Sequence, residues 1–200
     1  KRNQTILITS PKTSDGKTTV ALNLAYTFAA EERKVLVIDT NFRKPTASRV
    51  FAEEQGKRGH DYGLSNFLMS QCDKDAIIAS TDIENLDLVE SGPLPTGSAE
   101  LLGSERMSDL LKTVSHEYDY VIIDGPPQLV SEAKVLASQS DGTLLVFNAT
   151  STKKGAAQRI VRELKAIHAN VVGTVLIGVK SMKGGYFHEM YRSYQKYQYD

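Results

Sequence analysis

The stretch that decides the fold is SPKTSDGKTT, residues 10–19, which separates an apolar run from an amphipathic pattern. Its end, Gly16-Lys17-Thr18, matches the second half of a Walker A motif. Glycine lets the backbone approach phosphate oxygens, lysine brings them a positive charge, and threonine offers a hydroxyl to Mg²⁺. A GKT triplet alone is common, but its position between a strand and a helix predicts a nucleotide phosphate site. The residues expected to line this site are Lys12, Thr13, Ser14, Asp15, Gly16, Lys17, Thr18 and Thr19.

The rest of the chain alternates strand-like and helix-like segments, which is the pattern of an α/β protein. Several apolar runs hardly alternate with polar residues, as expected for parallel strands covered on both faces. We therefore expect a mostly parallel central sheet with helices on both faces. Strands are expected at residues 5–9, 34–39, 86–89, 118–124, 143–147 and 171–177. Helices are expected at residues 18–30 and 153–168 and from an N-cap at Ser104 to Val114, with connections at 40–62 and 91–98.

The composition excludes several classes of protein. The 200 residues carry 24 Lys and Arg against 24 Asp and Glu, so the formal net charge is zero. This balance argues against a nucleic-acid binder that works by bulk electrostatics, and we expect no nucleic-acid partner. The single cysteine, Cys72, excludes a disulfide framework. Because the chain begins Lys1-Arg2-Asn3 and not with methionine, we expect a domain cut from a longer polypeptide.

Two carboxylates strengthen the nucleotide interpretation. Asp39 and Asp124 each end an apolar strand-like run. In open parallel sheets, ligands bind at the carboxyl ends of the strands, so both side chains are expected near the phosphate site. An aspartate at a strand end often only caps the following loop, but two of them beside a GKT loop favour a role with Mg²⁺.

Three segments resemble the bacterial protein-tyrosine kinases of capsule and exopolysaccharide assembly, which are deviant Walker ATPases. Residues 39–46, DTNFRKPT, resemble their Walker A′ segment. Residues 90–102, which contain ESGPLP and AELL, resemble their SGPxPP…AELL segment. Residues 122–133, which contain IIDGPP and SEA, resemble their Walker B strand and the following helix. The similarity runs over almost the whole chain and is far more specific than a lone GKT.

The resemblance implies a P-loop tyrosine kinase domain at residues 1–180 that uses ATP and Mg²⁺. It implies catalytic roles for Lys17, Asp39, Asp124 and Arg43, and metal contacts from Thr18, Asp39 and Asp124. Asp39 is the candidate base or orienting group by family analogy; a loose transition state would need little help from a base. Arg43 either stabilises transferring charge, meets a neighbouring subunit, or belongs to a solvated basic turn.

Two positions depart from the family pattern. Pro11 stands where the Walker A motif usually begins with glycine, a departure that many of these kinases share. Asn41 stands where the family usually has a second aspartate, which removes one candidate metal-associated carboxylate.

Five of the nine tyrosines fall in the last fifteen residues: Tyr186, Tyr191, Tyr194, Tyr197 and Tyr199. One explanation is an aromatic patch that packs on a partner, since tyrosine is common at interfaces. Residues 181–200 contain no aliphatic residue, however, and we expect a flexible tail. The resemblance implies that these tyrosines are the autophosphorylation substrate.

The resemblance also implies partners and a location. It implies a ring-like homo-oligomer, a transmembrane polysaccharide co-polymerase or activator in the same or a separate chain, and the cytoplasmic face of a bacterial inner membrane. Two other functions remain open. A switch ATPase of the septum-site or partition type is favoured by Lys12, which lies five residues before Lys17, where that group has a signature lysine. A catalytically weak nucleotide-binding adaptor is favoured by Pro11 and Asn41.

Overall fold

The computed structural model describes residues 4–47, 49–50 and 62–179. Its strands are β1 (Thr5–Thr9), β2 (Val35–Asp39), β3 (Ile78–Ser80), β4 (Leu86–Val89), β5 (Tyr120–Asp124), β6 (Gly142–Asn148) and β7 (Val171–Ile177). Its helices are α1 (Lys17–Ala30), α3 (Leu64–Leu68), α4 (Ser98–Leu102), α5 (Glu105–Glu117), α6 (Ser131–Gln139) and α7 (Lys154–Ala166), with a 3₁₀ turn, η1 (Lys74–Ala76).

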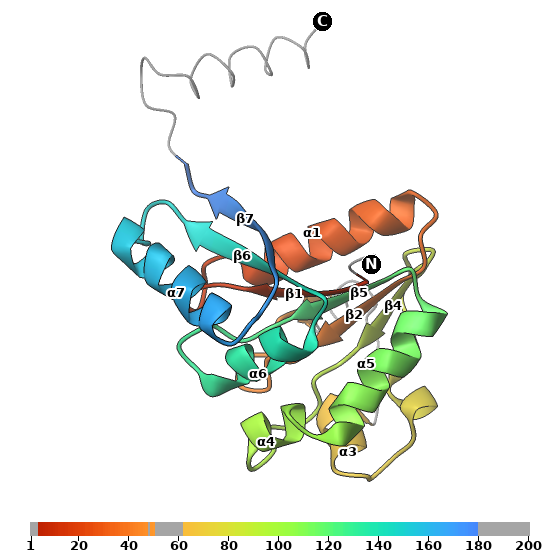
Figure 1. The fold of residues 1–200 in the computed structure, drawn as a ribbon. Helices are drawn as coiled ribbons and strands as arrows, with labels where there is room; N and C mark the ends of the chain where they lie inside the picture. Colours follow the sequence, from red (N-terminus) through yellow and green to blue (C-terminus); the bar gives the residue numbers. More distant parts are fainter. Residues whose placement is uncertain (1–3, 48, 51–61, 180–200) are drawn as a thin grey trace, which may run out of the picture.

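Within the described residues, seven strands form one sheet in the order β3-β4-β2-β5-β1-β6-β7. Every neighbouring pair is parallel except β3 and β4. Strand β5 lies between β1 and β2, so three strand ends meet beside the loop that enters α1 (Figure 1). This is the mostly parallel sheet that the sequence predicts.

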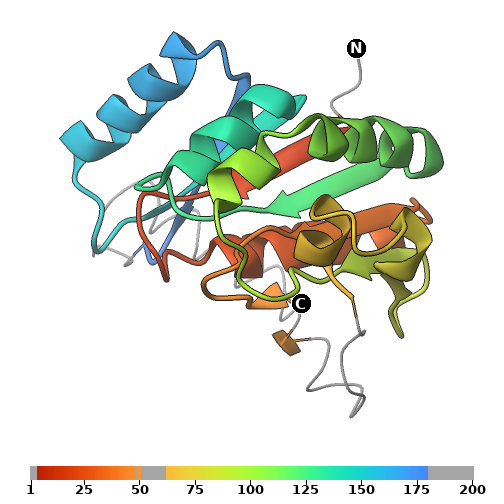
Figure 2. The same cartoon turned by 90° about the horizontal axis from the view of Figure 1, so that it is seen from below.

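Helices cover both faces of the sheet, as expected. On one face, α1 packs its small residues Ala21, Ala25 and Ala29 against the strands. On the other face, α5, α6 and α7 pack in a row, which Figure 2 shows in the view from below. The strand side chains divide accordingly: in β2, Leu36 and Ile38 face the second layer, and Val35 and Val37 face α1. Both faces are therefore buried, which explains why these runs do not alternate with polar residues.

The predicted strands and long helices are confirmed, with ends that shift by at most three residues. The predicted N-cap is also confirmed, because the Ser104 hydroxyl accepts a hydrogen bond from the Met107 N–H at 3.3 Å. Four short elements were not predicted, namely α3, η1, β3 and α4. Each has three to five residues, too few to show a helical or strand period.

The connection expected at residues 40–62 needs correction, since residues 47, 49 and 50 are helical. The connection at 91–98 also ends one residue earlier, because α4 begins at Ser98. Tertiary contacts hold such short pieces in place: the N–H groups of Leu64 and Ser65 in α3 donate to the carbonyls of Glu90 and Ser91. Among the described residues, no helix is long and apolar enough to cross a membrane. The tyrosine cluster lies outside the described residues.

Candidate active site

The loop between β1 and α1 has the backbone of an anion site. Ser14 and Gly16 have positive φ angles of 63° and 81°, which turn the chain sharply before α1 begins at Lys17. Gly16 is the N-cap of α1, and no side chain caps the helix. The first N–H groups of an uncapped helix carry partial positive charge and suit phosphate oxygens. The positive φ favours glycine at position 16, where a Cβ would also lie 2.5 Å from Cδ1, the flexible end of the Ile177 side chain.

A buried carboxylate braces this loop from inside. Asp15 accepts a hydrogen bond from the Lys12 N–H at 2.9 Å and one from the Ser151 hydroxyl at 3.3 Å. The Ser10 hydroxyl donates to the Lys12 carbonyl at 2.6 Å. Asp15, predicted to line the nucleotide site, thus has its carboxylate engaged within the protein. Lys12, Thr13 and Ser14 are exposed along the loop, and Thr19 is exposed in the first turn of α1.

The two predicted carboxylates lie side by side. Asp39 and Asp124 are register partners at the ends of β2 and β5, and both are fully buried. The Thr18 hydroxyl donates to Oδ2 of Asp124 at 2.7 Å, which joins the start of α1 to this pair. Oδ1 of Asp39 accepts the N–H of Asn41 at 3.0 Å. Lys17 is also buried at the same place.

The carboxyl group of Asp124 is in an unfavourable environment for its charge. Burial, and next the negative charge of Asp39, raise its pKa from 3.8 to about 7, against the opposing effects of Thr18 and Lys17. Its Oδ1 atom is buried and has no hydrogen-bond partner among the described residues. A buried, unpartnered carboxylate oxygen next to a second carboxylate is an environment that a cation would stabilise.

These residues fit a magnesium ion that binds together with a nucleotide. Mg²⁺ is usually held by one or two carboxylates, substrate phosphates and waters, not by a cage of protein ligands alone. Thr18, Asp39 and Asp124 would supply the protein side of such a site. Within residues 4–47, 49–50 and 62–179, no group of three His, Cys, Asp or Glu side chains is arranged to hold a metal without such help.

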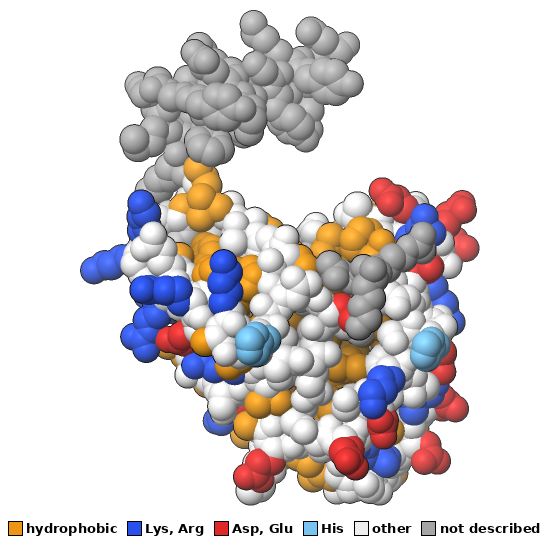
Figure 3. All heavy atoms as spheres, in the orientation of Figure 1, with side chains coloured by type: hydrophobic (Ala, Val, Ile, Leu, Met, Phe, Trp, Pro, Cys, Tyr) orange, Lys and Arg blue, Asp and Glu red, His pale blue; other side chains and the backbone are white. Residues whose placement is uncertain are grey.

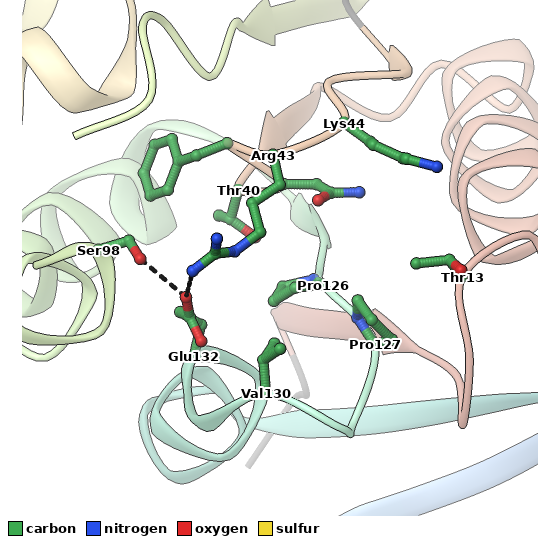
Figure 4. Close-up of a pocket in the computed structure, with 11 residues that line it drawn as sticks. Thr13, Thr40, Arg43, Lys44, Ser98, Pro126, Pro127, Val130 and Glu132 are labelled. Atoms are coloured by element: carbon green, nitrogen blue, oxygen red, sulfur yellow. Dashed lines mark hydrogen bonds and ion pairs between the residues drawn. The ribbon is translucent and has the colours of Figure 1, made fainter. Parts of the chain in front are cut away.

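A pocket of about 200 Å³ opens beside the phosphate loop (Figure 4). Arg43 reaches across it to Glu132 of α6, with 3.7 Å between Nη2 and Oε1. The hydroxyl of Ser98 in α4 donates to the same Oε1 at 2.7 Å. Burial would raise the pKa of Glu132, but hydrogen bonds from its own backbone and from Ser98, with the charge of Arg43, hold it below its usual value. The lining residues are Thr13, Thr40, Asn41, Phe42, Arg43, Lys44, Ser98, Pro126, Pro127, Val130 and Glu132.

Known proteins resemble this chain in sequence and in fold. A family model described as an AAA domain matches residues 3–176. The tyrosine-protein kinase YwqD of Bacillus subtilis is 34% identical over 184 residues, which are 92% of this chain and 76% of the relative. The crystal structure of the chimerical protein CapA2B2 matches with a TM-score of 0.81 at 33% identity, over 88% of this chain and 76% of that one. This chain belongs to the bacterial tyrosine-protein kinase family.

Membership of this family confirms the resemblance seen in the three segments, and the enzyme class is that of a tyrosine-protein kinase. The cell division ATPase MinD of Pyrococcus furiosus also matches, with a TM-score of 0.74 over 88% of this chain and 72% of that one. Its identity is 24%, so this likeness shows the fold alone.

The kinase fold brings together most of the predicted site residues. Thr18, Asp39 and Asp124 meet at the strand ends. Arg43 lies in an exposed turn, where its guanidinium lines the adjoining pocket. Asn41 lines the same pocket, so the position of the family's second aspartate faces the cavity. The five tyrosines predicted as acceptors lie outside the described residues.

The sequence did not predict two residues that line the pocket, Ser98 and Glu132. Glu132 belongs to the recognised SEA motif, but the motif assigns it no role in the site. Ser98 is not marked by any motif as a site residue. The two side chains are 34 residues apart in sequence and meet because α4 packs on α6. A glutamate that begins a helix after an apolar strand and two prolines was the available signal, since acidic residues favour the first turn of a helix.

Proposed function

We propose that this kinase transfers the γ-phosphoryl group of ATP to the tyrosines of residues 181–200, in trans within an oligomer. The observation that carries the proposal is the juxtaposition of an uncapped GKT helix start, two buried carboxylates and a separate pocket beside them. Phosphates fit the first feature, a cation fits the second, and an acceptor side chain fits the third.

The protein's contribution to nucleotide binding follows from the loop. The amides of the first turn of α1 and the ammonium group of Lys17 would hold the phosphates. Magnesium, when bound, would neutralise charge on the phosphates, and Thr18, Asp39 and Asp124 are the residues that would hold it. Burial of Asp39 and Asp124 keeps their charges from being screened by solvent.

The transfer forms a bond between a tyrosine oxygen and the γ-phosphorus and breaks the bond to the β–γ bridging oxygen, releasing ADP. The phenol has a pKa of about 10 and must lose its proton near the transition state. Asp39 is the proposed base or orienting group. A loose transition state would make this help small.

The acceptor tyrosine is proposed to enter the pocket lined by Thr40, Arg43 and Glu132. Its walls include two prolines and a valine, which suit an aromatic ring, and Arg43 offers a positive charge near the reacting end. The ion pair with Glu132, whose Oε1 also accepts the Ser98 hydroxyl, directs the guanidinium across the pocket.

The remaining proposals follow from the family. We propose a ring-like homo-oligomer that works with a transmembrane polysaccharide co-polymerase or activator at the cytoplasmic face of a bacterial membrane, and that regulates capsule or exopolysaccharide synthesis. Each added phosphate brings about −1.5 to −2 charges. Phosphorylation of many clustered tyrosines should therefore loosen such a ring by repulsion.

Mass spectrometry after incubation with Mg²⁺ and ATP tests the proposal. The wild type should gain phosphates on one or more of Tyr186, Tyr191, Tyr194, Tyr197 and Tyr199, and Lys17→Met should gain none. Lys34→Met, which removes an exposed lysine far from the loop, is the matched control and should behave as the wild type. Mixing the wild type with mass-tagged Lys17→Met tests transfer in trans, because phosphate on the tagged chain can only come from another molecule.

A wild type that binds ATP and remains unmodified, even with its activator present, would refute the kinase proposal. The switch ATPase would then be the leading alternative if ATP is hydrolysed, and exposure of Lys12 on the loop is the observation in its favour. Binding without hydrolysis or transfer would indicate the adaptor.

A further inference from the structure

The outward face of helix α7 is strongly basic, in a protein whose formal net charge is zero. Lys154, Arg159, Arg162 and Lys165 are exposed, whereas Leu164 is fully buried on the opposite side. Figure 3 shows Lys and Arg side chains gathered over the flank where Figure 1 places α7.

Acidic side chains do not neutralise this face. Glu163 is the one acidic residue of α7, and it is engaged by Arg159 at 2.7 Å and by Lys134 of α6 at 3.1 Å. The other three cations of the face have no ion-pair partner among the described residues. Unpaired cations on one helix face attract a partner that carries several negative charges.

The surface beside Arg162 also has a hollow, whose lining limits which negatively charged group can bind there. Ala157, Gln158, Val161 and Arg162 line a hollow of about 490 Å³. Its side chains offer an apolar floor, an amide and a guanidinium. A phosphotyrosine matches this set, because its ring packs on apolar side chains and its phosphate accepts paired hydrogen bonds from arginine. A lipid headgroup has no aromatic ring to pack on these apolar side chains.

The last described residues before the tyrosine segment, at the end of β7, lie close to the start of α7. The Ala149 N–H donates to the Ile177 carbonyl at 2.9 Å, so the end of β7 lies against the turn that leads into α7. A Cβ on Gly178 would lie 3.0 Å from Oδ1 of Asn148, the last residue of β6 before that turn. An extended chain covers up to ~3.5 Å per residue, and α7 is about 20 Å long. Tyrosines twelve or more residues beyond Val179 can therefore reach any part of the basic face.

Phosphorylation would reverse the charge of this segment. Residues 181–200 contain three basic and two acidic side chains, a formal charge of +1, which the basic face repels. Three phosphotyrosines would change this charge to about −3.5 to −5. The same segment would then be attracted to α7.

We infer that the outward face of α7 is a docking site for the phosphorylated tyrosine segment of this chain, with a ring over Ala157 and Val161 and its phosphate on Arg162. This inference rests on the proposed function, since the tyrosines must first be phosphorylated. A segment held on its own domain is withdrawn from a neighbouring subunit's pocket, so docking would end the exchange of phosphate between subunits.

Binding of synthetic peptides to the full chain tests this inference. The protein carries Lys17→Met so that it adds no phosphate, and fluorescent peptides of residues 181–200 are followed by anisotropy at low salt. The peptide with phosphates on Tyr191, Tyr194 and Tyr197 should bind at least about tenfold more tightly than the unmodified one. Because the phosphates are synthetic, the result does not depend on whether the chain is a kinase; failure of the proposed function would show only in the mass spectra.

Matched double variants locate the site. Arg162→Gln with Lys165→Gln should weaken binding of the phosphopeptide about tenfold, and 300 mM salt should weaken it further. Arg33→Gln with Lys112→Gln removes the same two charges from exposed positions elsewhere and should change binding less than about twofold. Thermal unfolding of both variants, measured in parallel, checks that they fold.

Equal binding of the two peptides, or equal losses in the two double variants, would overturn the inference. It would also be overturned if the phosphopeptide does not bind while the chain sediments with phosphatidylglycerol vesicles in a manner that depends on Arg162 and Lys165. That result would assign the face to an anionic lipid surface.

Discussion

Replacing Asp124 with asparagine is expected to stabilise the nucleotide-free protein against unfolding, by an amount that grows with pH. The folded pKa of about 7 lies above the ordinary 3.8, so between these values the folded state binds more protons than the unfolded state. Stability therefore falls as the pH rises through this window. The penalty is on the order of 2 kcal/mol at pH 5 and 4 kcal/mol at pH 8. Asparagine does not ionise, and its Oδ1 can still accept the Thr18 hydroxyl.

The measurable quantity is the difference in unfolding free energy between Asp124→Asn and the wild type, which should increase by about 2–3 kcal/mol from pH 5 to pH 8. Using this difference cancels any constant cost of the new amide. Urea unfolding should be followed by circular dichroism, because the chain has no tryptophan. Asp82→Asn, at an exposed position, should stay within about 0.5 kcal/mol of the wild type.

If the difference in unfolding free energy between Asp124→Asn and the wild type is the same at pH 5 and pH 8, the argument that burial and Asp39 destabilise the charged carboxylate is refuted. Mg²⁺ with a nucleotide provides an independent check. It should raise the unfolding temperature of the wild type strongly and that of Asp124→Asn weakly, because a cation relieves the penalty only where a charge is present.

Two further substitutions test the loop and the pocket. Gly16→Ala should destabilise the protein by about 1–3 kcal/mol in urea unfolding and weaken ATP binding, because φ is positive there and Cβ would approach Ile177. Gly155→Ala, in open space within α7, should instead stabilise by about 0.5–1 kcal/mol, and a matching loss at both glycines would contradict this reading. Glu132→Gln should raise the KM for a tyrosine peptide several-fold with unchanged ATP affinity, because Arg43 loses its partner. An altered ATP affinity would argue against a role confined to the acceptor. The substitution should also lower the free energy of unfolding slightly at pH values above the usual glutamate pKa. Because the folded pKa of Glu132 is lowered, this difference should disappear as the pH falls through the folded pKa.

The long elements could be predicted because their signals are local. Strands β1, β2 and β5 are uninterrupted apolar runs, and α5 has a serine N-cap followed by a helical period. Strand β3 could not be predicted, because its three residues become a strand only by pairing with β4. Helix α3 likewise depends on the backbone of residues 90 and 91, which supplies its first acceptors.

The site divides in the same way. The GKT loop and the two strand-end aspartates were recognisable from sequence, because residue type and spacing decide what a helix start and a strand end can bind. The contact between Ser98 and Glu132 in the pocket could not be predicted, because no rule of sequence spacing places these two residues together.

By itself, the sequence determined which segments form strands and helices, where the phosphate loop lies and which side chains end the strands, since these depend on neighbours along the chain. The tertiary structure alone decided that β5 lies between β1 and β2, and hence that Asp39 and Asp124 are buried side by side with a raised pKa. It also decided which acid pairs with Arg43 and where the basic face of α7 lies relative to the end of β7. These properties depend on contacts between distant segments, whose free energy comes from packing and desolvation and not from local conformational preference.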